Sequence, residues 1–144
     1  MIIPTIILLV TIALLWFAQE EVGPVESISR LFYHQKTRKL FKAALWLNGG
    51  LLILYDPGNT TLTLGGLALI GVPIFGDFLD RTTRWFHFSL AGLFFIFTSW
   101  YISPWMTLLL GAGFALGMKI IPKRKIYWLE VIGILTLIIG FYFI

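Results

Sequence analysis

The chain has 144 residues, of which 58% are hydrophobic and 12% charged, and its mean hydropathy is +0.89. A soluble domain is about half apolar and a quarter charged, so the composition excludes an ordinary soluble protein and predicts an integral membrane protein. The absence of cysteine excludes disulfide bonds, cysteine-ligated zinc and thiol catalysis. The net charge of +4 does not indicate nucleic-acid binding, because the basic residues flank apolar segments.

The apolar segments predict a single all-α domain, a polytopic bundle of about six transmembrane helices. A spanning helix needs about 20 apolar residues, and these segments reach that length when they extend into their polar flanks. The first is interpreted as a span rather than a cleaved signal peptide, because no basic residue precedes it and WFAQ is a poor cleavage site. The predicted spans cover residues 2–18, 41–55, 61–76, 85–102, 105–121 and 126–144.

The connections between these spans differ sharply in polarity. Residues 19–40 form the longest polar segment, and VESISRLFYH within it has the apolar spacing of a short interfacial helix. The loops 19–42, 77–84 and 119–125 contain five, two and four lysines or arginines, which together are all eleven. Basic residues mark the cytoplasmic face of a membrane protein, so both termini are expected on the non-cytoplasmic side.

The stretch DFLDRTTRWFH, residues 77–87, concentrates ionisable residues near the middle of the chain. Asp77 and Asp80 each precede an arginine by four residues, a spacing that pairs acids with bases on a helix. Asp80 is alternatively the N-cap of the fourth span. A catalytic or metal-binding role for Asp80 stays open beside these two structural interpretations.

His87 and Glu130 are predicted to lie inside the membrane, near the same face. His87 is predicted to lie about two turns, or ~10 Å, inside the fourth helix, and Glu130 about one turn into the sixth span. Ionisable groups at such depth need a partner. The structural interpretation is an interhelical bond from Glu130 to Arg84 or His87, and the functional alternative is a proton-titrating pair.

Two further sets of side chains are candidates for binding. Basic residues of the first polar segment are predicted to attract anionic lipid headgroups, with a merely solvated face as the alternative; they are Arg30, Lys36, Arg38 and Lys39. A mixed metal site on the cytoplasmic side is the second candidate, with His34, Asp77, Asp80 and His87 as its ligands.

Glycine spacing bears on how the spans pack. GAGFALG, residues 111–117, contains a GxxxG pair formed by Gly113 and Gly117. Such a pair lets two helix backbones approach closely. The contact is expected within one bundle, and a homo-oligomer or another membrane partner is the alternative.

The segments ESISRLFY, GGLALIGVPIFGDF and FHFSLAG resemble small polytopic membrane proteins of bacteria and phages, which are distantly similar to the alkaline ceramidase and progestin/adiponectin receptor superfamily. The resemblance covers about residues 25–95. It implies a helical bundle with a histidine-bound zinc that hydrolyses lipid amides, and catalytic roles for Ser27 or Ser29, Asp80 and His87. Because no histidine follows His87, the paired HxxxH of that superfamily is missing, and the resemblance can carry the fold without the activity.

The leading functional hypothesis is a non-enzymatic membrane protein, either a subunit of a larger assembly or a lipid-binding module. A metal-dependent lipid hydrolase of the ceramidase type, with zinc as its cofactor, is the first alternative. A small proton-coupled transporter that uses His87 and Glu130 is the second.

Overall fold

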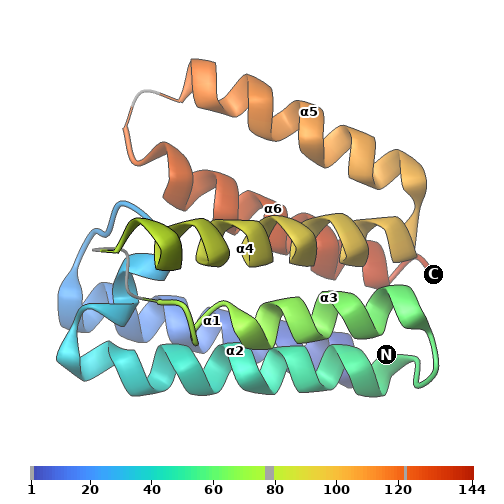
Figure 1. Cartoon of the computed structure of the whole chain (residues 1–144), viewed down its shortest axis with the longest axis horizontal. Coiled ribbons are helices and arrows are strands. Elements are labelled where there is room, and N and C mark those ends of the chain that lie inside the picture. The colour runs from blue at the N-terminus through green and yellow to red at the C-terminus, as the bar shows by residue number, and fades with distance from the viewer. Residues whose placement is uncertain (1, 77–79, 122) are drawn as a thin grey trace.

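The computed structural model describes residues 2–76, 80–121 and 123–144, and every regular element in these ranges is helical (Figure 1). The prediction of an all-α fold is confirmed. The elements are α1 (Ile2–Val22), the 3₁₀ helix η1 (Ile28–Phe32), α2 (Gln35–Tyr55), α3 (Thr60–Gly71), α4 (Arg81–Ile102), α5 (Pro104–Ile120) and α6 (Lys125–Phe141).

Several helices extend past the apolar segments into their polar flanks. α1 continues to Val22 and α2 begins at Gln35, so the polar segment between them shortens to a loop that holds η1. α3 is instead shorter than its apolar segment and ends at Gly71. Pro73 contributes to this end, because proline has no backbone N–H with which to continue the hydrogen-bond pattern of the helix. By length and composition, α1 and α4 are the described helices that are able to cross a membrane.

The helices pack as a bundle in which chain neighbours lie side by side (Figure 1). α2 packs between α1 and α3, α3 packs on α4, and α6 contacts α4, α5 and α1. Both chain ends lie at one end of the bundle. The opposite end, which we call the basic end, comprises the α1–α2 loop, the start of α4 and the α5–α6 connection. All eleven lysines and arginines belong to the basic end or to the helix turns next to it.

α2 and α3 cross with their backbones in direct contact. A Cβ atom added to Gly49 would lie 2.7 Å from the carbonyl oxygen of Gly66, and one added to Gly66 would lie 2.6 Å from that of Gly49. Both distances are far shorter than a carbon–oxygen contact permits. Glycine at these two positions therefore allows the crossing.

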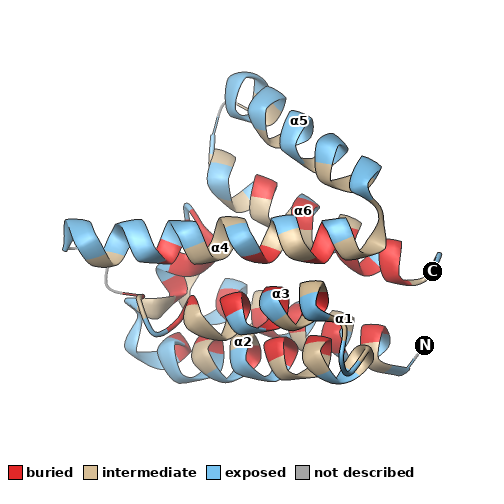
Figure 2. Ribbon diagram, turned by 45° about the vertical axis from the view of Figure 1, so that its right-hand side comes forward, coloured by how far each residue is buried: buried red, intermediate tan, exposed pale blue. Residues whose placement is uncertain are grey.

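α5 differs from the other long helices because it has no buried residue. Figure 2 shows it exposed along most of its length and diverging from the rest of the bundle. The predicted GxxxG pair does not act as a unit in this packing. Gly117 lies against Leu129 of α6, whereas a Cβ added to Gly113 would have no neighbour within 4 Å.

Candidate functional site

His87 lies on the core side of α4 and is fully buried. Its Nδ1 is 3.0 Å from the carbonyl oxygen of Val72, the residue that follows α3. Because a carbonyl oxygen only accepts hydrogen bonds, Nδ1 carries a proton and donates it. In the neutral ring Nε2 is then an acceptor, and it lies 2.9 Å from the Ser29 hydroxyl. His87 thus joins α4 to the end of α3 and to η1.

Glu130 approaches the same turn from α6. Its Oε2 accepts a hydrogen bond of 2.6 Å from the backbone N–H of Ile28. The Ser29 side chain also interacts with this carboxyl group. Ser29 therefore contacts both predicted groups, and the link between α4 and α6 runs through η1 rather than through a direct bond from Glu130 to His87 or Arg84.

The segment that carries Ser29 closes the basic end of the bundle, and we call residues 25–33 the η1 plug. Leu31 has no exposed surface, and its carbonyl oxygen accepts a hydrogen bond of 2.8 Å from the Thr37 hydroxyl of α2. The backbone N–H of Tyr127 donates to the carbonyl oxygen of Glu26 at 3.0 Å, which ties the plug to the first turn of α6. Contacts from α2 and α6 therefore fix the position of the serine.

The arrangement has two possible chemistries. A serine hydroxyl bonded to an imidazole nitrogen is the pairing that activates a serine nucleophile. Ser29 is only 7% exposed and His87 is fully buried, and the space that Ser29 and Glu130 line measures about 50 Å³, which is too small for a lipid substrate. A hydroxyl can, however, accept a hydrogen bond on one side while it donates on the other, so Ser29 is placed to pass a proton between Glu130 and His87.

The other residues predicted for a catalytic site, Ser27 and Asp80, lie apart from the linked side chains of Glu130, Ser29 and His87. Ser27 is buried in the η1 plug, but the hydroxyl beside His87 belongs to Ser29. Asp80 is exposed and caps α4: its Oδ2 accepts from the backbone N–H of Thr83 at 2.7 Å and from the Thr83 hydroxyl at 2.9 Å. These two hydrogen bonds hold the pKa of the Asp80 carboxyl below its ordinary value. Its position therefore serves helix capping.

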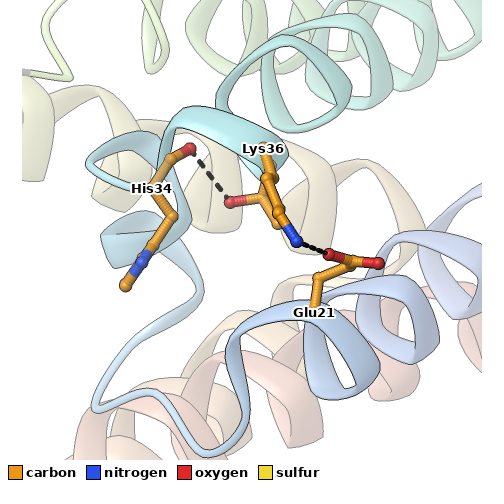
Figure 3. Close-up of polar contacts among 4 residues, drawn as sticks. Glu21, His34 and Lys36 are labelled. Carbon is orange, nitrogen blue, oxygen red and sulfur yellow. Dashed lines mark hydrogen bonds and ion pairs between the residues drawn. The ribbon is translucent and has the colours of Figure 1, made fainter.

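The predicted metal ligands do not converge in the part of the chain that is described. His34 is exposed at the N-cap of α2, and Figure 3 shows its imidazole pointing away from the neighbouring contact between Glu21 and Lys36. Within residues 2–76, 80–121 and 123–144, no three His, Asp or Glu side chains lie close enough to hold a metal ion. Asp77 is outside these ranges. The described residues consequently do not fit a histidine–carboxylate zinc site.

The ion pair of Figure 3 shows how the basic residues of the first polar segment are used. Lys36 Nζ lies 2.6 Å from Glu21 Oε2, which joins the start of α2 to the end of α1. The hydrogen bond and charge of Glu21 raise the pKa of Lys36. This predicted headgroup ligand therefore already has a carboxylate partner within the chain.

Two more of the predicted headgroup residues also have internal partners. Arg30 forms an ion pair of 2.7 Å with Glu26, four residues before it. Arg38 donates from Nε to the carbonyl oxygen of Phe32 at 2.8 Å, and its guanidinium lies over the ring of the same residue. Lys39 is exposed. The first polar segment thus commits most of its basic groups to contacts that fix the loop.

A different basic surface is open at the start of α4. Arg84, predicted as a partner of Glu130, is exposed and lines a cleft of about 650 Å³. The cleft is formed along one side of the helix by Arg81, Arg84, Trp85, Phe88 and Ser89. Arg81 was predicted only as the ion-pair partner of Asp77, which lies outside the described residues, and not as part of a binding surface. The signal that could have revealed it is the helical spacing of these five residues, at i, i+3, i+4, i+7 and i+8.

Two apolar furrows flank α5. The furrow between α5 and α6 measures about 370 Å³, and its lining includes Leu109, Gly113 and Gly117 from α5 and Leu129 and Ile132 from α6. The furrow between α4 and α5 measures about 200 Å³. Both exist because α5 buries no side chain against its neighbours.

Comparisons with known proteins identify no relative of this chain. No family model matches the chain, and no curated protein or solved structure is significantly similar to it.

Proposed function

We propose that the chain is a polytopic membrane protein that crosses the bilayer six times, with both termini on the non-cytoplasmic side. The lengths and composition of α1 and α4 support a membrane location. The bundle supports the sidedness, because its basic residues gather at the end opposite to the chain ends. Large apolar side chains on the outside of the bundle, among them Trp16, Leu54 and Leu109, contact lipid in this arrangement.

Within the membrane the chain acts as a lipid-binding module without catalysis. The observation that carries this proposal is the furrow between α5 and α6, an apolar space of about 370 Å³ beside a helix with no buried residue. Water in such a space would leave apolar surface hydrated, whereas an acyl chain fills it at no such cost. A furrow of this shape retains lipid more firmly than the flat outer surface of a helix does.

Filling the furrow tests the proposal. Gly113→Leu adds a side chain that lines the furrow without a clash, because nothing lies within 4 Å of its Cβ position. We expect the number of phospholipids retained per chain in mild detergent, counted by native mass spectrometry, to fall by at least one. Ala112→Leu is the matched control, since Ala112 is exposed on α5 and lines neither furrow.

Equal retention by the two variants and the parent chain would contradict lipid binding in the furrow. Copurification of a defined protein partner that Gly113→Leu releases would instead identify the furrow as a subunit interface. That result would replace the lipid-binding module with a subunit of a larger assembly.

A further inference from the structure

The two arginines at the start of α4 are the exposed basic groups with a cleft beside them. Arg81 and Arg84 both line the cleft of about 650 Å³, and neither guanidinium group forms a hydrogen bond or ion pair with a described residue. This distinguishes them from Arg30 and Lys36, whose charges are paired with carboxylates. A pair of guanidinium groups at i and i+3 presents donors that suit the oxygens of a phosphate.

Beyond these arginines, the same side of α4 presents first aromatic and then mainly apolar residues. Trp85 is 69% exposed and Phe88 49% exposed in the cleft. The next positions on this side, Gly92, Phe95 and Ile96, line the furrow between α4 and α5. The spacing of three and four residues keeps all of them on one face, opposite to the buried His87 and its core neighbours. Cleft and furrow are therefore successive parts of one surface.

The order of chemistry along this surface matches the order in a phospholipid. Tryptophan is typical of the membrane–water boundary, and the arginines precede it on the side of the basic end. From Trp85 to Ile96 the helix rises about 16 Å at 1.5 Å per residue, roughly half of a hydrocarbon core ~30 Å thick. One acyl chain of a single leaflet has this reach.

We propose that this face of α4 binds one anionic glycerophospholipid of the cytoplasmic leaflet, with its phosphate on Arg81 and Arg84 and an acyl chain in the furrow between α4 and α5. This proposal rests on the proposed membrane topology. It goes beyond the proposed function because it names the charge of the lipid headgroup and a second lipid site, distinct from the furrow between α5 and α6. Trp85 lies at the level of the glycerol backbone. Gly92 leaves room for the chain, because a Cβ added there meets nothing within 4 Å.

Native mass spectrometry of the whole chain with phosphatidylglycerol or phosphatidylcholine of identical acyl chains tests the site. We expect the chain to bind phosphatidylglycerol more tightly, and each arginine-to-glutamine change to lower this affinity by about fivefold, from ~1 kcal/mol per basic residue near the surface. The double variant Arg81→Gln/Arg84→Gln should therefore lose about 25-fold. The matched control is Lys119→Gln/Lys123→Gln, which removes the same charge from exposed positions of the basic end outside the cleft and should retain most of the parent affinity.

The hydrocarbon part of the site has its own variant and probe. Gly92→Leu fills the furrow with both arginines intact and should also lower phosphatidylglycerol affinity. Glycerol 3-phosphate added in excess should fail to displace the lipid, because it lacks the acyl chain. Displacement by glycerol 3-phosphate would overturn the lipid as occupant and leave a simple phosphate site.

The remaining outcomes separate this inference from the proposed function. Equal affinity for the two lipids, or unchanged phosphatidylglycerol binding in the double arginine variant, would overturn the anionic site. If Gly113→Leu still lowered lipid retention in that case, the furrow between α5 and α6 would stand. Failure of the parent chain to retain any lipid would overturn both.

Discussion

Replacing His87 with alanine is expected to lower the free energy of unfolding by about 2–4 kcal/mol. The imidazole is fully buried and bonded to the Val72 carbonyl oxygen and the Ser29 hydroxyl. Its removal leaves a cavity and two buried polar groups that lose a partner, and each such group costs about 1–3 kcal/mol. Titration with sodium dodecyl sulfate in mild detergent micelles, followed by circular dichroism, measures the change.

The second histidine is the control for that experiment. His34 is exposed, and its side chain makes no capping hydrogen bond to α2. We therefore expect His34→Ala to change the free energy of unfolding by less than about 0.5 kcal/mol. Equal effects of the two substitutions would show that the bonds of His87 to α3 and η1 do not hold the basic end together.

Gly49→Ala is expected to destabilise the protein by about 1–3 kcal/mol, because its methyl group would lie 2.7 Å from the carbonyl oxygen of Gly66. A backbone atom cannot move aside as a flexible side chain can, so α2 and α3 must separate. Gly66→Ala should act similarly. The effects of the two changes should not add, since both remove the same close contact.

The residue next to Gly49 provides a matched control. A Cβ added to Gly50 meets nothing within 4 Å, and both glycines are in the interior of α2. Gly50→Ala should leave the free energy of unfolding unchanged or raise it by at most about 1 kcal/mol, because alanine favours a helix over glycine. Destabilisation by Gly50→Ala to the same extent as Gly49→Ala would argue against a close crossing of α2 and α3.

The helices were predictable because each apolar segment is bounded by turn or charged residues, as at Asp80 and at Ser103-Pro104. The exact ends of the helices were less predictable, because α3 ends at Gly71 while its apolar segment continues to Gly76. The missing backbone N–H of Pro73 interrupts the helix there, although the sequence stays apolar. The basic end was also predictable, because it depends only on the order of charges and spans.

The partners of the buried ionisable groups could not be predicted from residue types. Glu130 binds a backbone N–H, that of Ile28, and every residue except proline carries such a group. The choice between Ser27 and Ser29 depends on how the five-residue turn η1 faces His87. Tertiary packing decides both.

The exposed surface beside α5 could not be predicted from the sequence, for a different reason. The sequence of α5 is as apolar as that of a buried helix, yet it buries no residue. A bilayer solvates an apolar helix as well as a protein core does, so hydropathy alone does not tell whether a helix packs inside or at the edge. The arginine cleft, by contrast, follows from helical spacing once Arg81 is known to begin α4.

Single-cysteine labelling tests the six crossings most directly, because the chain contains no cysteine of its own. Cysteine is placed at one position per variant, at Asn59, Ser103 or Ile144 on one side and at His34, Arg81 or Lys123 on the other. Intact cells are treated with a membrane-impermeant maleimide. We predict labelling at Asn59, Ser103 and Ile144 without permeabilisation, and labelling at the other three only after it. Labelling of any position of the basic end in intact cells, together with protection of Ile144, would contradict the proposed topology.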